Sequence, residues 1–227
     1  MDADMLAGME LFAGLPEAAL RDVRAAARIR RLPGDTHIFG QGEPAAHVHA
    51  LVEGGVRITQ SGSDGGEAVM RFIGPGEMFG TVALFTDRLY PAEAVTLGEA
   101  VEASWGEAAL HDLIGRHPRI ALNILGIVGR RLAEAQERIR ELSTQRVERR
   151  LAHSLLRLAD QAGQGGANGT TIRFPLTRKD VAAVAGTTLH TASRVLTAWE
   201  KAGLILTDQR HVTLRQPEAL RRIAEEE

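Results

Sequence analysis

Three side chains in one C-terminal segment have the types that nucleophilic catalysis uses. Asp180, His190 and Ser193 are an acid, a base and a nucleophile, as in a hydrolase triad. His190 and Ser193, however, lie only three residues apart on one predicted exposed helix, and no oxyanion-hole glycine loop accompanies them. The chain also has no phosphate-binding glycine loop ending in Lys-Ser or Lys-Thr, and no His-Glu-x-x-His pair. We therefore do not expect an enzyme.

Metal chemistry is restricted by the composition. The chain contains no cysteine, which excludes disulfides, thiolate zinc sites and cysteine-ligated iron–sulfur clusters. His47 and His49 would face the same side of a strand, but two ligands at that spacing are far more often incidental than a metal site. The sequence predicts no metal centre.

The same C-terminal segment has the pattern of two short helices joined by a tight turn. Thr177 can cap the first helix, with Asp180 in the capping-box position, and Gly186 ends it. Thr187 or Thr188 then caps a second helix. This spacing predicts a helix-turn-helix. The predicted buried face of its second helix consists of Leu189, Ala192, Val195, Leu196 and Trp199.

Side chains rich in hydrogen-bond donors lie off that buried face. Arg194 is long enough to reach guanine O6 and N7 in a DNA major groove. The threonines at the turn and the Arg178-Lys179 pair suit phosphate contacts, which position a protein without reading sequence. The predicted DNA contacts are Arg178, Lys179, Thr187, Thr188, Leu189, His190, Thr191, Ser193, Arg194 and Thr197.

Two further features favour double-stranded DNA over a generic helix pair with a solvated polar face. Leu204-Ile205-Leu206 and Val212-Thr213-Leu214 flank a polar turn, which predicts a β-hairpin wing beside the second helix. Charge is also divided unevenly, because residues 1–145 carry 14 Lys or Arg against 20 Asp or Glu, whereas residues 146–227 carry 13 against 9. A basic C-terminal part suits a polyanionic partner.

The elements that must position these residues fall into distinct stretches of sequence. Residues 5–28 predict helix, since they are rich in alanine and have few breakers. Residues 29–105 contain short apolar runs separated by recurring glycines, which is typical of a β-roll or jelly roll. Residues 61–66 form a plausible hairpin tip within it. The predicted fold class is therefore α+β.

A long helix is predicted from about Pro118 to Ser143, within a helical region that begins near Glu107. Its apolar residues recur at alternating steps of four and three, which is the heptad spacing of a coiled coil. A helix packed only on its own domain is the alternative, but three heptads with small residues in the seam favour a homodimer. The predicted dimer seam is Ala121, Leu125, Val128, Leu132, Ala135, Ile139 and Leu142.

The rest of the C-terminal part is predicted as an amphipathic helix at 147–162, a turn at 163–169 and a short strand at 171–174. No run approaches the ~18 apolar residues that span a bilayer, and the acidic N-terminus does not resemble a signal peptide. We expect a cytoplasmic protein without a membrane partner. The predicted domains are a β-roll at 1–117, a dimerisation helix at 118–145 and a winged helix-turn-helix at 146–227.

The whole chain resembles the CRP/FNR family of bacterial transcription regulators. The match runs from Leu11 to about Leu214 and includes LFAGLP, LPGDTHIFGQGEPAAHVHALVEGGVRI and GPGEMFGTVALF, in the family's order and spacing. The resemblance implies a cyclic-nucleotide-binding-type β-roll, a homodimer that binds a palindromic operator, and contact with RNA polymerase. His190, Ser193 and Arg194 match the family's base-reading positions; His190 stands where the family often has Glu, which leaves the half-site sequence open.

The resemblance also locates an effector pocket, and this chain departs from the family there. In members that bind cyclic AMP, a Glu holds the ribose and an Arg pairs with the cyclic phosphate. Here Thr81 replaces the Glu, Pro91 or Ala92 replaces the Arg, and Glu93 would repel a phosphate. Each lost contact costs ~1.5–3 kcal/mol, so cyclic AMP is not the expected effector. The predicted pocket consists of Phe79, Gly80, Thr81, Val82, Ala83, Arg88, Tyr90, Pro91 and Ala92.

Two alternatives for regulation stay open. The FGTVALF…YPA pattern resembles the DNR-like branch of the family, which implies a haem that senses nitric oxide or carbon monoxide. Its axial ligand would be a histidine, and the candidates are His37, His47, His49, His111 and His117. The other alternative is a regulator without a ligand, controlled by its abundance. A cyclic-nucleotide-binding module attached to other machinery would keep the Glu and Arg and lack the helix-turn-helix, and the sequence contradicts both.

Overall fold

The computed structural model describes residues 3–63 and 65–225 and divides into two compact units. The first comprises residues 3–60 and 73–136, and the second comprises the described residues of 61–72 and 137–225. Asp64 of the predicted hairpin tip lies outside the described residues, as do the acidic ends of the chain.

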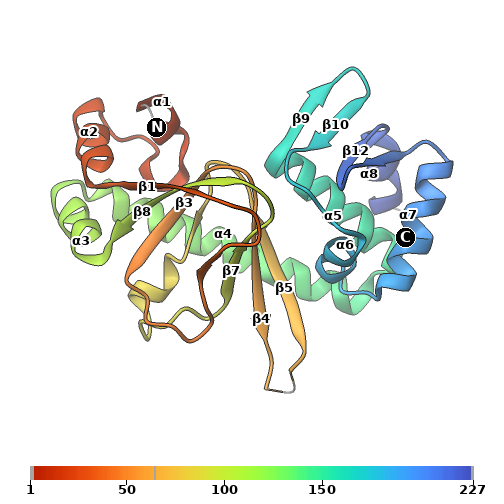
Figure 1. The fold of residues 1–227 in the computed structure, drawn as a ribbon, viewed down its shortest axis with the longest axis horizontal. Coiled ribbons are helices and arrows are strands. Elements are labelled where there is room, and N and C mark those ends of the chain that lie inside the picture. The colour runs from red at the N-terminus through yellow and green to blue at the C-terminus, as the bar shows by residue number, and fades with distance from the viewer. Residues whose placement is uncertain (1–2, 64, 226–227) are drawn as a thin grey trace. The chain divides into compact units, whose positions relative to one another are not determined.

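The first unit contains a β-roll with helices at both of its chain ends (Figure 1). Two four-stranded sheets form it, in the orders β1-β8-β3-β6 and β2-β7-β4-β5, although residues 67–72 of its fifth strand and 137–144 of its last helix belong to the second unit. The strands are β1 (Arg28–Leu32), β2 (His37–Phe39), β3 (His47–Glu53), β4 (Val56–Ser61), β5 (Glu67–Ile73), β6 (Met78–Phe79), β7 (Glu93–Thr96) and β8 (Ala100–Gly106). The helical segments are α1 (Ala3–Gly8), η1 (Glu10–Phe12), α2 (Glu17–Ala26), η2 (Val82–Phe85), α3 (Glu107–Arg116) and α4 (Arg119–Thr144). The strands predicted between residues 29 and 105 are confirmed.

The helix predicted over residues 5–28 is wrong as a single element. The segment consists of α1, η1 and α2, and β1 begins at Arg28. Gly14 has a φ of +74°, which no right-handed helix accommodates. Pro16 then disfavours helical backbone at Leu15 and serves as the N-cap of α2. Helix propensity alone therefore overestimated the length of this element.

The long helix α4 begins and ends within a residue of its prediction. Its inner face buries Ile120, Ile124 and Ile127 in the core of the roll. Asn123 and Arg131 also tie it to the first unit, because they donate hydrogen bonds to the carbonyls of Leu11 and Met78 at 2.9 and 2.6 Å. These inward contacts leave the predicted seam on a different side of the helix.

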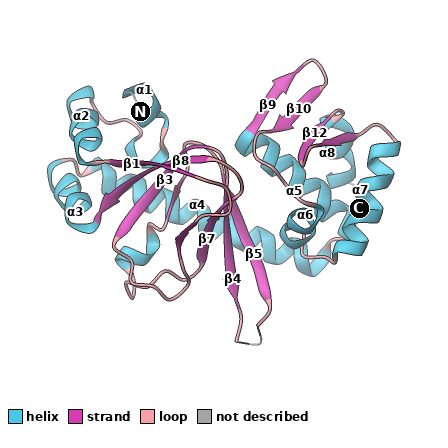
Figure 2. Cartoon of the chain, in the orientation of Figure 1, coloured by secondary structure: helices cyan, strands magenta, loops and turns pink. Residues whose placement is uncertain are grey.

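The second unit is an α/β module around one small sheet with strand order β11-β12-β10-β9 (Figure 2). Its elements are α5 (Val147–Ala162), β9 (Gly163–Gly166), β10 (Gly169–Ile172), α6 (Arg178–Val184), α7 (Leu189–Lys201), β11 (Ile205–Asp208), β12 (His211–Leu214) and α8 (Pro217–Glu225). The predicted helix at 147–162, the helix-turn-helix and the wing are confirmed.

The glycine-rich segment 163–169 is not merely the predicted turn. Residues 163–166 form β9, which pairs with β10. A side chain at Gly163 would place its Cβ 2.2 Å from the carbonyl oxygen of Ala159, and one at Gly169 would lie 2.1 Å from the carbonyl oxygen of Leu214. The glycines are needed for close packing of backbone on backbone, a role that local turn propensity does not reveal.

Candidate nucleic-acid interface and effector pocket

The helix-turn-helix owes its local geometry to three short-range features. Thr177 and Asp180 form the predicted capping box at the start of α6, and the Thr177 amide donates to the Asp180 carboxylate at 2.9 Å. The turn passes through Gly186 at a φ of +61°. Thr188 caps α7, since its hydroxyl accepts a hydrogen bond from the Thr191 amide.

Arg150 of α5 binds the turn between α6 and α7. Its guanidinium donates to the carbonyls of Gln145, Ala185 and Gly186 at 2.7, 2.9 and 3.0 Å. A cation is well placed at the carboxyl end of α6, where backbone carbonyls lack helical partners. Arg150 thus positions α6 and the turn without belonging to the predicted interface.

The outer face of α7 presents the predicted base-reading side chains. His190 and Arg194 are exposed, and Ser193 and Thr197 are half-buried. These four line an open depression of about 480 Å³ together with Ala198 and Lys201. Arg194 has no ion-pair partner among the described residues. The exposed face of α7 is therefore rich in available hydrogen-bond donors.

Lys201 was missed by the sequence reasoning, although a signal for it exists. It continues the helical spacing of 190, 194 and 197 with another step of four, which places it on the same face of α7. Its exposed ammonium adds a cation at the end of the depression.

Arg178 and Leu189 differ from their predicted settings. The Arg178 guanidinium donates to the Ser193 carbonyl and the Thr197 hydroxyl at 2.9 and 2.7 Å, and it pairs with Glu200 at 2.8 Å. It therefore joins α6 to α7, whereas Lys179 beside it is exposed. Leu189 is 51% exposed, so its assignment to the buried face is wrong. It is the first residue of α7, and the buried residues of this helix begin at Ala192.

The wing is a tight hairpin of β11 and β12. Gln209 and Arg210 form its two-residue turn with φ of +45° and +68°. This is the backbone of a type I′ hairpin turn. The Arg210 side chain is exposed at the tip.

An apolar stripe runs along α4. Leu132 and Ile139 are 60% and 64% exposed, which is unusual for large apolar side chains arranged in a row. The other large exposed apolar residues of this helix are Leu122, Leu125, Val128 and Leu142. Of the two predicted seam alanines, Ala135 is exposed and Ala121 is half-buried. Six of the seven predicted seam residues are therefore exposed in this stripe. Leu122, which was not predicted, also belongs to it.

The predicted effector residues form a mostly buried cassette without a free cation. Phe79, Ala83 and Ala92 are buried, whereas Val82 and Pro91 are exposed. Arg88, the nearest cation in sequence, pairs with Glu107 at 2.7 Å. Thr81 is buried and its hydroxyl has no hydrogen-bond partner, as is also the case for Thr59 of β4.

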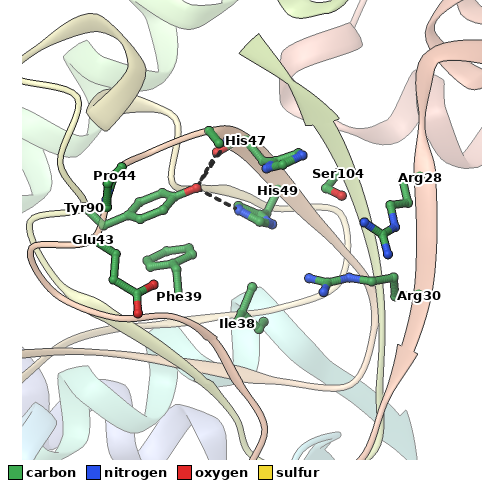
Figure 3. A pocket seen from close by; sticks show the side chains of 11 residues that line it. Arg28, Arg30, Ile38, Phe39, Glu43, Pro44, His47, His49, Tyr90 and Ser104 are labelled. Atoms are coloured by element: carbon green, nitrogen blue, oxygen red, sulfur yellow. Dashed lines mark hydrogen bonds between the residues drawn. The ribbon is translucent and has the colours of Figure 1, made fainter.

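A buried polar network lies beside this cassette and was not predicted. Glu102 of β8 has no exposed side-chain surface, and Arg30 donates to it at 2.6 and 3.0 Å. His49 contacts its other oxygen and lies 3.2 Å from the Tyr90 hydroxyl, which in turn donates to the His47 carbonyl at 2.8 Å. Figure 3 shows the Tyr90 hydroxyl between these two histidines.

Burial and charge shift the acid–base properties of this network. Burial alone would raise the pKa of the Glu102 carboxyl, but the hydrogen bond and charge of His49, with those of Arg30, bring that pKa below its usual value. Burial raises the pKa of the Tyr90 phenol. The Glu102 carboxylate is therefore held as an anion by its two basic neighbours.

The histidines proposed for haem do not fit that group. His37 pairs with Glu93, and His117 pairs with Asp22, at 3.2 and 3.0 Å. His49 has partners on both ring nitrogens, and the cavity next to it and His47 measures about 200 Å³. Pockets for drug-sized ligands measure ~300–1,000 Å³. His111 is exposed on the surface of α3.

The described residues contain no group of three His, Asp or Glu side chains placed to bind a metal ion. Within the same residues, no helix is long and apolar enough to cross a membrane.

Comparison with known proteins identifies both units. Residues 29–117 match the model of the cyclic nucleotide-binding domain, and residues 149–223 match that of the Crp-like helix-turn-helix domain. The cyclic AMP receptor protein of Thermus thermophilus is 32% identical over 219 residues, covering 96% of this chain and 97% of that protein. The nitrogen fixation regulation protein FixK of Rhizobium meliloti is 34% identical over 185 residues, covering 81% of each chain.

Solved structures agree with this assignment. The structure of FixK2 from Bradyrhizobium japonicum superimposes with a TM-score of 0.77 at 24% identity, covering 88% of this chain and 98% of that one. The structure of the c-di-GMP responsive global regulator CLP from Xanthomonas campestris gives a TM-score of 0.71 at 25% identity, covering 88% and 99%. The resemblance stated from sequence motifs is confirmed: the chain belongs to the CRP/FNR family of DNA-binding transcription regulators.

Proposed function

We propose that this regulator acts as a homodimer that reads a two-fold symmetric DNA operator with the α7 helices of its two copies. The apolar stripe of α4 carries this proposal. Large apolar residues at heptad spacing, more than 40% exposed, lose contact with water when an identical helix pairs with them. A symmetric dimer then presents two recognition helices to half-sites ~34 Å apart.

Within each half-site, the side chains of α7 divide the work of recognition. Arg194 is suited to guanine, whereas His190 and Ser193 read neighbouring base edges. The exposed methyl groups of Leu189 suit a thymine methyl. Lys179, with the threonines at the turn and Thr191, meets phosphates and fixes the register. Arg178 and Thr197 act by holding α7 in place.

The effector of this regulator differs from cyclic AMP. A cyclic phosphate needs a cation, and in the cassette Arg88 is already paired with Glu107 while Pro91 and Ala92 carry no charge. The unpartnered hydroxyls of Thr59 and Thr81 favour a ligand with polar groups but without a phosphate. As the family resemblance implies, we also propose contact with RNA polymerase and a cytoplasmic location.

Two experiments on the full-length chain test these claims. Sedimentation of the protein alone and bound to its operator duplex is expected to give two chains and two chains per duplex, respectively. Calorimetry with cyclic AMP is expected to give no binding heat and no change in operator affinity. A monomer that binds one half-site would refute the dimer, and saturable heat from cyclic AMP would refute the effector assignment.

The paired Arg88 also supports a second candidate, a regulator whose DNA affinity needs no ligand. Under this proposal the purified protein binds its operator at full affinity, and occupancy follows protein concentration alone. Extensive dialysis, which removes bound small molecules and, with a chelator present, metal ions, leaves that affinity unchanged. A cell extract of small molecules that shifts the affinity would exclude this candidate.

A further inference from the structure

The first unit contains a cavity of about 200 Å³ that is distinct from the predicted effector cassette. Tyr90 is the single member of that cassette among its lining residues. The remaining walls come from β1, β2, β3, β8 and the loop after β2 (Figure 3). They are Arg28, Arg30, Ile38, Phe39, Glu43, Pro44, Ala46, His47, His49 and Ser104.

Strand register places the polar wall of this cavity. Ser104 of β8 pairs with Arg28 on one side and with His49 on the other, so these three side chains lie in one row across the sheet. Arg30 and His47 are two residues along their strands and share the same face. Figure 3 shows both arginines reaching from β1 toward the histidines, with Ser104 between them.

Several donors on this wall have no protein partner. Ser104 is 3% exposed, and its hydroxyl makes no hydrogen bond within the described part of the chain. The Arg28 guanidinium forms no ion pair with any described residue. Arg30 donates hydrogen bonds from Nε and Nη2 to the Glu102 carboxylate, which leaves its Nη1 available to a ligand. The Ser104 hydroxyl is not among the fully buried polar atoms without a partner, so it opens onto the cavity and is available to a ligand there.

One wall of the cavity brings together two guanidinium groups and two histidines. Of the nearby acids, the Glu102 carboxylate is hydrogen-bonded by Arg30 and His49, and the exposed Glu43 carboxylate accepts a hydrogen bond from the Gly40 amide at 2.9 Å. The pKa of His47 is lowered, first by burial and then by the positive charges of its basic neighbours. An anion in the cavity would relieve this repulsion.

The opposite wall is apolar except for the carboxylate of Glu43. The Phe39 ring stacks on the Tyr90 ring at a centroid distance of 3.8 Å, and Ile38 and Pro44 extend this surface. A bare inorganic ion would leave that surface without contacts. A ligand with an anionic head and a small apolar body matches both walls.

We propose that this cavity binds a small organic carboxylate, with its carboxylate on Arg28, Ser104 and His47 and its apolar body against Phe39. Binding is communicated to the cassette by Tyr90, whose ring forms one wall and whose hydroxyl contacts His49. The proposal depends on neither the dimer nor DNA binding.

Tyr90 also supplies the means of testing this site, because it is the one tyrosine of the chain. Full-length protein containing 3-fluorotyrosine gives a single ¹⁹F resonance at the cavity wall. Acetate, butyrate and benzoate are titrated to about 10 mM, a limit that still detects millimolar affinity, against sodium chloride of equal ionic strength and inorganic phosphate. We expect butyrate or benzoate to shift the resonance saturably, and chloride and phosphate to leave it unmoved.

Variants then locate the bound carboxylate. Arg28→Gln is expected to weaken binding by about tenfold, since a charge-assisted hydrogen bond is lost. Ser104→Ala should weaken it by at least threefold, or about 0.6 kcal/mol. Arg31→Gln removes the same charge from the opposite face of β1 and should change the affinity by less than about twofold.

Three results would overturn the proposal. The first is an unmoved resonance with every organic carboxylate. The second is saturable binding of phosphate alone, which would make the site one for inorganic ions. The third is equal weakening by Arg28→Gln and Arg31→Gln, which would show that general surface charge, not the cavity, attracts the anion.

Discussion

Arg194 and Lys179 carry the same charge on one module, but we propose that Arg194 contacts a base and Lys179 contacts a phosphate. Arg194 lies in the exposed row of α7, whereas Lys179 lies at the start of α6. Arg194→Ala is expected to weaken operator binding by about 1–3 kcal/mol and to leave non-specific binding nearly unchanged. Lys179→Ala should weaken binding to all sequences alike and reduce the salt slope by about 1. Fluorescence anisotropy with operator and scrambled duplexes measures both, and equal losses for Arg194→Ala on both duplexes would show that it contacts phosphate only.

Glu102 makes the stability of the first unit depend on pH. Its lowered pKa in the folded chain means that its contribution is complete above the unfolded value of about 4.3 and is lost as pH falls through the folded value. Glu102→Gln is expected to cost about 2–3 kcal/mol at pH 7, less than for a fully buried pair because Arg30 is partly exposed.

Urea denaturation at a series of pH values checks this expectation. The difference between parent and Glu102→Gln should shrink as pH falls below about 4. Glu99→Gln, an exposed change next to the same strand, serves as the control and should cost little at any pH. A Glu102→Gln penalty that is constant with pH would show that its charge is unimportant.

Sequence distance explains which residue contacts could be predicted. The Thr177–Asp180 capping box spans three residues, so its motif was readable directly. The network of Arg30, His49 and Glu102 joins three strands whose register no local pattern specifies. The sequence suggested His49 only as a metal ligand paired with His47 or as a haem ligand, and its contacts with Glu102 and Tyr90 depend on the sheet register.

At the scale of elements, α4 carries the dimer proposal. Leu132→Asp combined with Ile139→Asp places two carboxylates in the proposed seam and is expected to weaken the dimer at least about a hundredfold. Ala133→Asp introduces the same group one position away, outside the heptad seam, and should leave the dimer intact. Analytical ultracentrifugation distinguishes them, and a double variant that stays dimeric would show that the seam lies elsewhere.

The strand β9 offers a matched pair of glycines. Gly163→Ala drives a Cβ to within 2.2 Å of the Ala159 carbonyl oxygen, whereas at Gly165 nothing lies within 4 Å. We expect Gly163→Ala to destabilise the second unit by about 1–3 kcal/mol and Gly165→Ala to change its stability by under about 0.5 kcal/mol. Thermal unfolding followed by differential scanning calorimetry measures both, and equal effects would contradict the close packing of β9.

Periodicity predicted the helices better than composition predicted the glycine-rich strand. The heptad of α4 and the amphipathic pattern of α5 repeat over many residues, so their boundaries were accurate. β9 consists of Gly-Gln-Gly-Gly, whose low strand propensity is overridden by pairing with β10. In the N-terminal segment the local signals were present but outweighed by alanine content, because Gly14 and Pro16 separate α2 from the helical turns before it.

At the scale of the whole molecule, the proposed function requires two copies acting together. Each copy brings one α7 helix and one basic module, and a two-fold axis along α4 relates the pair in our proposal. The family and its fold followed from ordered motifs along the chain. The identity of a ligand did not follow from these motifs, because the cassette lacks the charged residues that the resemblance implies for cyclic AMP binding, and the cavity lined by Arg28 and Ser104 is assembled by strand register.

The most direct test of the proposed symmetric recognition is selection of duplexes from a random pool by the full-length protein. We predict an enriched palindrome with half-sites centred about 10 base pairs apart, one helical turn. The same selection with Arg194→Ala should lose a guanine–cytosine pair at one symmetric position in each half-site. Enrichment of a single, unrepeated half-site, or of no sequence at all, would contradict the account.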